Sequence, residues 1–302
     1  MAVDLIARYA ELTAEGILQI RRGDFRHAVD NFEEARLLAG ELQDPQLHVK
    51  ALCNLSTARL AVGDVQQAEK GLREILLKTH DLQMVYHASS NLASALRRQG
   101  RLEKALPFAR RALQAAIELD DPVRKAASHN LIANIHLNMN YLDEAMAEYR
   151  HALALNEQGA AGWDNIDCIK ENLGYCLLLK KRIQEGIAVI LEALQIATAN
   201  QNVRCIAECN QDLSFAYMQT RELEQAEVCG EKALALALEH QFVDFQKNCY
   251  YLLGEINLLL GNEEKSDHYF DRLQELYPHL PVLKDFLRSF DVSSIISLKN
   301  PF

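Results

Sequence analysis

Four polar residues recur at one position of a repeating pattern in this sequence of 302 residues. Asn54, Asn91, Asn172 and the near-isosteric Asp212 each stand nine residues before a turn-forming residue that recurs along the chain. An asparagine amide offers two N–H donors and an acceptor oxygen, so a row of them can hydrogen-bond the backbone of an extended peptide. The alternative is that these amides bond neighbouring backbone groups or water, which is common for asparagine on a helix surface.

Charged and aromatic side chains accompany this polar series. Arg98 and Asn134 fall on the same predicted helix face, with Arg97 near its edge, and arginine binds a carboxylate or phosphate through two parallel N–H groups. Tyr175 and Phe215 stand six residues before their turns, where an aromatic ring can form an apolar pocket for a partner side chain. Solvated charge for the arginines and core packing for the aromatic rings are the competing interpretations.

The turn-forming residues define a repeat that continues through the chain. The segments RRGDFRHAVDNF, AVGDVQQAEKGL and RQGRLEKALPFA align on their glycines, and four later turns follow in the same frame. Successive turns are 40, 37, 40, 41, 40 and 40 residues apart. Self-similarity at such a period is typical of repeat architectures. The seven turn residues are Gly23, Gly63, Gly100, Asn140, Lys181, Arg221 and Gly261.

Two series of small residues flank the seven turns. A small side chain stands seven residues before each turn and another stands five residues after it. Large apolar side chains recur beside both series at steps of three and four residues, which is helical periodicity. Small residues at both places predict two helices whose backbones cross closely within each unit. The first series is Gly16, Ser56, Ala93, Ala133, Gly174, Ser214 and Gly254, and the second is Ala28, Ala68, Ala105, Ala145, Gly186, Ala226 and Ser266.

This pattern of small and large positions resembles the tetratricopeptide repeat family over most of the chain. The last unit, YYLLGEINLLLGNEEKSDHYFDRLQELYP, keeps the Leu-Gly pair, the turn glycine, the phenylalanine and the closing Pro278 of that family. The units are longer than the usual repeat of about 34 residues. They are similar to the longer variety found in kinesin light chains, spindle-orientation adaptors and bacterial Rap-type regulators. Tetratricopeptide grooves carry asparagine ladders, and Asn54, Asn91, Asn172 and Asp212 match that place in the repeat.

The resemblance implies an all-α fold, a right-handed α-solenoid of seven helical hairpins, in a single domain that spans residues 1–302. A short amphipathic helix within 279–302, with Leu283, Phe286, Leu287 and Phe290 on one face, is expected to cap the stack. The tail ends in Asn300, Pro301 and Phe302, a string that resembles the ligand of EH domains. The expected units are residues 5–45, 46–85, 86–123, 124–165, 166–203, 204–244 and 245–278.

Chemistry of other kinds has little support in the sequence. The chain has no metalloprotease, nucleophile-elbow, phosphate-loop or dinucleotide-binding motif, so we expect no enzyme and no cofactor. Seven cysteines form no C-x-x-C pair and are expected to be free, buried thiols. Cys205 and Cys209 lie four residues apart on one helical face, but no further metal ligands are expected to converge on them.

Charge and hydropathy restrict the partner class. A net charge of −10 argues against nucleic acid, because phosphate binding requires a broad basic surface. No apolar run is long enough to cross a bilayer, and the acidic N-terminal segment does not look like a secretion signal, so we expect a cytoplasmic protein without membrane insertion. One segment is locally basic and could meet an acidic partner, although a solvated surface is the simpler interpretation: Arg97, Arg98, Arg101, Lys104, Arg110 and Arg111.

These patterns favour a scaffold or adaptor that binds a peptide segment of a partner protein in the concave groove of the stack. A second copy of the same chain is an allowed partner as well. The alternative function, implied by the resemblance to Rap-type sensors, is a signalling regulator that responds to a peptide or another effector.

Overall fold

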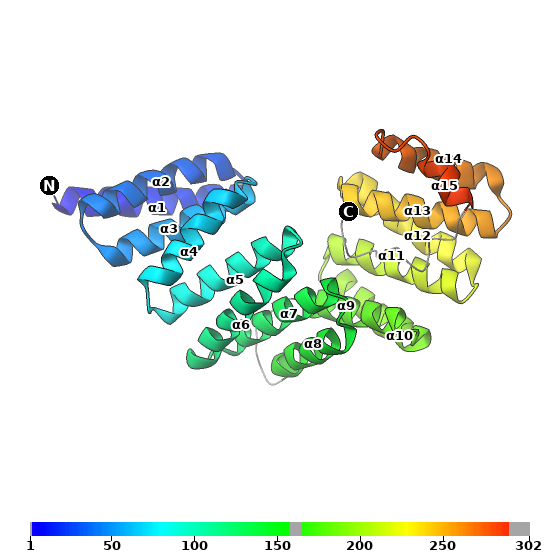
Figure 1. Cartoon of the computed structure of the whole chain (residues 1–302), viewed down its shortest axis with the longest axis horizontal. Helices are drawn as coiled ribbons and strands as arrows, with labels where there is room; N and C mark the ends of the chain where they lie inside the picture. Colours follow the sequence, from blue (N-terminus) through cyan, green and yellow to red (C-terminus); the bar gives the residue numbers. More distant parts are fainter. Residues whose placement is uncertain (1, 158–164, 290–302) are drawn as a thin grey trace. The chain divides into compact units, whose positions relative to one another are not determined.

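The computed structural model describes residues 2–157 and 165–289, and within them the chain forms fifteen α-helices and no β-strand (Figure 1). None of these helices is both long and apolar enough to cross a membrane. The predicted all-α solenoid of seven hairpins is confirmed. The helices are α1 (Ala2–Arg22), α2 (Phe25–Glu41), α3 (Pro45–Ala61), α4 (Val65–Lys78), α5 (Leu82–Arg98), α6 (Leu102–Glu118), α7 (Pro122–Asn138), α8 (Leu142–Glu157), α9 (Ile166–Leu179), α10 (Ile183–Ala199), α11 (Val203–Gln219), α12 (Leu223–Glu239), α13 (Val243–Leu259), α14 (Glu263–Leu276) and α15 (Leu283–Ser289).

The described helices belong to two compact units, and the division passes through α8. The first unit holds the chain up to Met139 with the last residues of α8, and the second holds 140–153 with the chain from residue 165. Consecutive helices pack on each other from α1 through α7 in the first unit and from α9 through α15 in the second. That the whole chain forms a single domain stays a prediction.

Within each unit the odd-numbered helices form a layer of their own. Helix α5 contacts both α3 and α7 in the first unit, and α11 contacts both α9 and α13 in the second. Contact between the equivalent helices of successive hairpins marks the layer where a curved stack is most crowded, which is the inner side of a solenoid. The residues predicted to bind a peptide all lie on these odd-numbered helices.

The seven predicted turns all have left-handed backbone geometry. Gly23, Gly63, Gly100 and Gly261 have φ between 70° and 85°, while Asn140, Lys181 and Arg221 have φ of 61°, 61° and 65°. The helices before Gly23, Gly63, Gly100, Lys181, Arg221 and Gly261 end in a Schellman motif, as where Glu222 N–H donates to the Tyr217 carbonyl at 2.9 Å and Arg221 N–H to that of Met218 at 3.2 Å. A left-handed residue therefore reverses the chain in every hairpin, even where the side chain disfavours it.

The two series of small residues meet across the hairpins, as predicted. The Ser214 hydroxyl on α11 donates to the Ala226 carbonyl on α12 at 2.8 Å, and the Ser266 hydroxyl on α14 donates to the Gly254 carbonyl on α13 at 2.9 Å. A Cβ atom on Gly186 would lie 3.0 Å from the Gly174 carbonyl oxygen. At these crossings only a serine hydroxyl or the hydrogen atom of a glycine separates the two helix backbones.

Large rings fill the space beside the small residues. The Phe32 and Phe270 side chains are almost fully buried. A Cβ atom on Gly16 would lie 2.6 Å from the Phe32 ring, and one on Gly254 would lie 2.4 Å from the Phe270 ring. The glycines therefore leave the space into which the rings of the second helix pack. A larger residue at the glycine position would require a smaller residue at the ring position.

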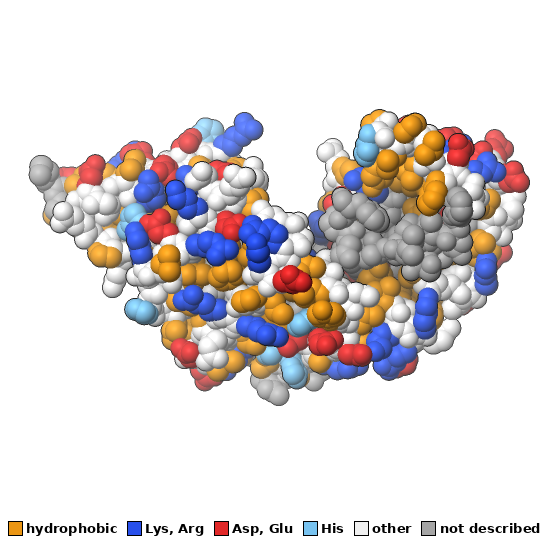
Figure 2. Space-filling model, viewed as in Figure 1, with side chains coloured by type: hydrophobic (Ala, Val, Ile, Leu, Met, Phe, Trp, Pro, Cys, Tyr) orange, Lys and Arg blue, Asp and Glu red, His pale blue; other side chains and the backbone are white. Residues whose placement is uncertain are grey.

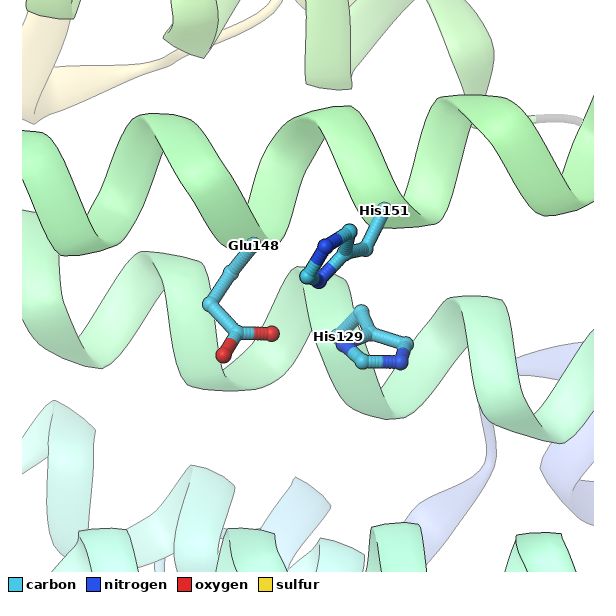
Figure 3. A group of neighbouring side chains, drawn as sticks. All are labelled: His129, Glu148 and His151. Atoms are coloured by element: carbon cyan, nitrogen blue, oxygen red, sulfur yellow. The ribbon is translucent and has the colours of Figure 1, made fainter.

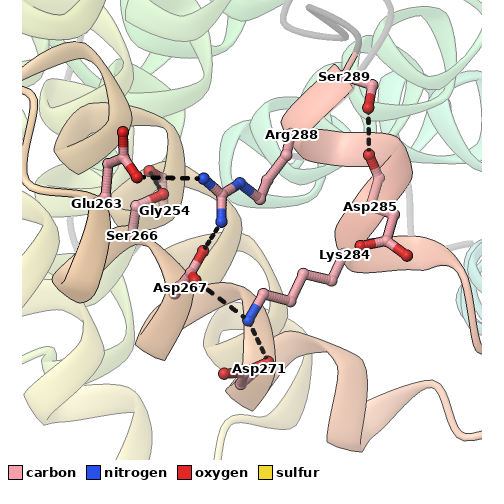
Figure 4. Close-up of polar contacts among 9 residues, drawn as sticks. All are labelled: Gly254, Glu263, Ser266, Asp267, Asp271, Lys284, Asp285, Arg288 and Ser289. Atoms are coloured by element: carbon pink, nitrogen blue, oxygen red, sulfur yellow. Dashed lines mark hydrogen bonds and ion pairs between the residues drawn. The ribbon is translucent and has the colours of Figure 1, made fainter.

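Helix α15 is shorter than the predicted capping segment, and its contacts with α14 are mainly ionic (Figure 4). Leu287 is buried, Lys284 pairs with Asp271 at 2.7 Å, and Arg288 pairs with Asp267 and with Glu263. The described part of the predicted cap thus packs on the last hairpin. Phe290 and the tail ending in Asn300, Pro301 and Phe302 lie outside the described residues.

We predict that Gly186→Ala destabilises the chain. The added methyl group would lie 2.5 Å from Leu178 Cδ2 and would press on the Gly174 carbonyl. Overpacking of this kind costs about 1–3 kcal/mol, more than the roughly 0.5–1 kcal/mol that alanine gains over glycine within a helix. Gly40→Ala in α2 is the matched control, because its Cβ would meet nothing within 4 Å. Urea denaturation should show a loss for the first variant and none for the second; equal stability of the two would contradict close packing at Gly186.

We also predict opposite effects at two turns. Arg221→Gly should stabilise the chain by about 1 kcal/mol, since it removes the left-handed strain of a residue with a Cβ, whereas Gly63→Ala should destabilise it by about the same amount. Thermal melting followed by circular dichroism measures both changes. Shifts in the same direction would show that backbone conformation does not govern these turns.

Candidate functional site

In the first unit the polar series consists of Asn54 on α3 and Asn91 on α5, both half-buried. Asn91 Nδ2 donates to Thr57 Oγ1 at 3.1 Å, and Thr57 Oγ1 donates to the Cys53 carbonyl at 3.0 Å. These bonds join two successive odd-numbered helices and hold the Asn91 amide in place. The second N–H and the Oδ1 atom of Asn91 remain as hydrogen-bonding groups for a ligand.

In the second unit the series consists of Asn172 on α9 and Asp212 on α11. Asn172 is half-buried, and its Nδ2 donates to the Cys168 carbonyl of its own helix at 2.9 Å. Asp212 is fully buried. Asn91 and Asn172 thus each use one of their two N–H donors within the chain and keep the other. Asp212 lies beneath the surface.

The other residues predicted for binding differ in how far they are engaged within the chain. Arg97 Nη1 on α5 donates to Asn138 Oδ1 on α7 at 3.3 Å, which links these two helices. Arg98 is exposed and Asn134 is half-buried. Of the two arginines, Arg98 is therefore the more exposed.

Tyr175 and Phe215 lie on the neighbouring helices α9 and α11 and are both buried, with 0% and 5% of their surface exposed. Burial of this degree is what core packing produces. Their use as a pocket for a partner side chain stays a prediction that requires movement of the side chains around them.

The locally basic segment is partly neutralised by its surroundings. Arg101 pairs with Glu69 at 2.7 Å, and Arg73 pairs with the same carboxylate at 2.9 Å. Arg111 donates to the Leu76 carbonyl at 3.3 Å. Basic and acidic side chains lie next to one another on the first unit in the space-filling view (Figure 2). This segment is a mixed charged surface rather than a uniformly basic patch.

Two small clefts lie in the first unit, and none of the predicted binding residues lines either of them. One of about 250 Å³ lies between α2, α3 and α4, where Arg36 and Arg59 both pair with Glu33. The other, of about 210 Å³, lies between α5 and α6 beside Arg111. Their size suits a few water molecules or a small ion better than a peptide.

A group of side chains of types that can bind a metal lies in the second unit and differs from the sequence-based expectation for the cysteines. All seven cysteines are free thiols, but Cys168 and Cys229 are half-buried and not buried as predicted. Ligand atoms of Asp167, Cys168 and Cys205 lie within 4.8 Å of one another, so further ligands do converge on Cys205. The only signal in the sequence was the repeat frame, which places the first turns of successive odd-numbered helices side by side. No short motif could indicate the group, because its residues lie on two helices.

Two further side chains of types that bind metals lie on the part of α8 that belongs to the second unit. Glu148 and His151 lie three residues apart on α8 and so share one face of it, and Figure 3 draws them with His129 of α7. His129 belongs to the first compact unit, and the two α8 residues belong to the second.

Comparisons with known proteins agree with this architecture. Two models of the tetratricopeptide repeat match the chain, one at residues 84–158 and the other at residues 248–280. The first match runs from within α5 to the end of α8, and the second runs from within α13 through α14.

One curated relative is the 43 kDa receptor-associated protein of the synapse from Tetronarce californica, which is 22% identical over 212 residues. The match covers 66% of this chain and 50% of the relative, so the chain spans about half the length of that protein.

Solved structures of Rap proteins have a similar fold. The apo form of RapI aligns with a TM-score of 0.74 at 13% identity, over 93% of this chain and 98% of that one. A Rap protein in complex with competence and sporulation factor aligns with a TM-score of 0.64 at 14% identity, over 93% of this chain and 76% of that one. The chain thus contains two stretches that match the tetratricopeptide repeat, at residues 84–158 and 248–280, within a fold that is similar to that of the Rap proteins.

Proposed function

We propose that the chain is an interaction scaffold that binds an extended peptide segment of a partner protein along its odd-numbered helices. The observation that carries this proposal is the state of Asn91 and Asn172. Each amide is held by one hydrogen bond within the chain and keeps a second N–H and an oxygen. An amide that is already fixed loses little side-chain entropy when a ligand binds, which favours affinity.

The mode of recognition follows from the spacing of these amides. In the first unit Asn54 and Asn91 lie on the successive odd-numbered helices α3 and α5, so each can bond a different part of a ligand backbone, and backbone contacts tolerate many ligand sequences. Arg98, exposed at the end of α5, would add a preference for an acidic or C-terminal carboxylate group near that end of the first unit. The chain's net charge of −10 disfavours strongly acidic ligands elsewhere, so a basic or neutral segment with one carboxylate fits best.

We predict that replacing both amides weakens peptide binding without loss of structure. A displayed library of extended peptides supplies the probe, and a peptide selected on the wild-type chain is measured by calorimetry. A lost hydrogen bond costs about 1 kcal/mol, so the variant in the unit that holds the peptide, Asn91→Ala or Asn172→Ala, should lower affinity roughly 5-fold, and the double variant should show the same loss. The single variants show which unit holds the peptide.

Asn31→Ala is the matched control, since Asn31 lies on the even-numbered helix α2 and its Nδ2 also makes one bond within the chain, to Gln19 Oε1 at 2.9 Å. Its affinity should equal that of the wild type. Unchanged affinity in the double variant, with unchanged helicity, would refute the proposal.

A regulator that changes conformation with an effector is the second candidate, supported by the likeness to RapI along nearly the whole of both chains. A regulator needs two states with different affinity for the effector. Small-angle scattering with and without the selected peptide separates the two functions: a changed profile supports the regulator, and an unchanged profile leaves only the scaffold.

A further inference from the structure

The first turns of two helices in the second unit bring three metal-binding side chains together. Asp167 and Cys168 lie in the first turn of α9, and Cys205 lies in the first turn of the neighbouring helix α11. One ligand atom from each lies within 4.8 Å of the other two, and the thiols of Cys168 and Cys205 are hydrogen-bonded. Two sulfurs in hydrogen-bond contact need to move little to reach the roughly 3.8 Å that separates ligands on one tetrahedral zinc at Zn–S of about 2.3 Å.

A single asparagine joins all three of these residues. Asn202 precedes α11, and its Nδ2 donates to Asp167 Oδ2 at 2.8 Å and lies 3.6 Å from Cys168 Sγ. Its Oδ1 accepts the backbone N–H of Cys205 at 3.3 Å. Side chains that orient metal ligands typically hydrogen-bond them from behind in this way. Asn202 thus fixes the carboxylate and both thiol-bearing helix turns relative to one another.

The charges around this cluster favour a cation. Asp167 has no exposed surface, and its carboxylate accepts only from the neutral N–H groups of Asn202 and Cys168. Among the described residues no basic side chain pairs with it; the adjacent Arg204 pairs with Glu208 at 3.4 Å and lies over the Phe245 ring. A buried carboxylate without a cationic partner is costly, and a bound metal ion would offset that cost.

We propose that Asp167, Cys168 and Cys205 bind a zinc ion, with water as the fourth ligand. Two thiolates and one carboxylate suit Zn²⁺, which accepts both sulfur and oxygen. Cu⁺ prefers sulfur throughout, while Mg²⁺ and Ca²⁺ prefer oxygen throughout. Cys168 is half-buried, so an ion can reach the three side chains from solvent at this residue. The site would tie α9 to α11. It lies one helical turn from Asn172, whose amide bonds the Cys168 carbonyl, but its ligand atoms are side-chain atoms that the proposed peptide binding does not use.

The test uses the full chain, kept reduced and stripped of metal by a chelator. Thiol titration must first find seven thiols, the number of free cysteines in the structure. Co²⁺ is then added as a spectroscopic substitute for Zn²⁺. A thiolate-to-cobalt charge-transfer band, visible bands typical of tetrahedral coordination, and their loss when Zn²⁺ is added would support the site. Two missing thiols would indicate a Cys168–Cys205 disulfide and overturn the proposal.

Variants distinguish this site from adventitious binding. Cys168→Ser and Cys205→Ser should each weaken Zn²⁺ binding by more than about 100-fold, because losing a ligand costs more than losing a supporting hydrogen bond, which costs roughly 10–100-fold. Cys229→Ser is the matched control, since Cys229 is a half-buried thiol in the same unit outside the cluster. Absence of the charge-transfer band in the wild type, or an equal band in the Cys168→Ser, Cys205→Ser double variant, would refute the site.

Discussion

The close approach of two helix backbones within each hairpin is the constraint on which the rest of the structure depends. At the crossing of α9 and α10 a Cβ atom on Gly186 would lie 3.0 Å from the Gly174 carbonyl, and at the crossing of α11 and α12 the Ser214 hydroxyl bonds the opposite backbone directly. A hairpin closed this tightly leaves its bulky side chains at the edges of the crossing, where they pack on the next hairpin. The stack follows from that arrangement.

The same constraint explains which features could be predicted from the sequence. Small side chains at the crossings and left-handed residues at the turns are requirements of the backbone, so they recur in every unit and are visible as a pattern. Even Lys181 and Arg221 were identifiable as turn residues from the frame alone, although neither residue type favours that conformation. The fold was predictable because it depends on residue size and chain geometry, which repeat.

The candidate sites were less predictable because they depend on contacts that do not repeat. The repeat frame placed Asn91 and Asn172 on the odd-numbered helices, but it held no information on their hydrogen-bond partners. Asn91 bonds Thr57 on another helix, and Asn172 bonds the Cys168 carbonyl on its own helix. The cluster around Cys205 combines residues 37 positions apart, from two helices and in different registers. Such groups become visible only when neighbouring hairpins are placed side by side.

The ion pairs between α15 and α14 have a consequence for the C-terminal end of the described chain. Lys284 and Arg288 reach three carboxylates, and most of these side chains are at least partly exposed to solvent. Dissolved salt screens exposed pairs over a Debye length of about 8 Å at physiological ionic strength, but it hardly affects the buried crossings. Fraying should therefore begin at this end as ionic strength increases, while the internal hairpins stay closed. The attachment of α15 to α14 therefore depends on the ionic strength, whereas the other hairpins are held by the steric fit of their side chains.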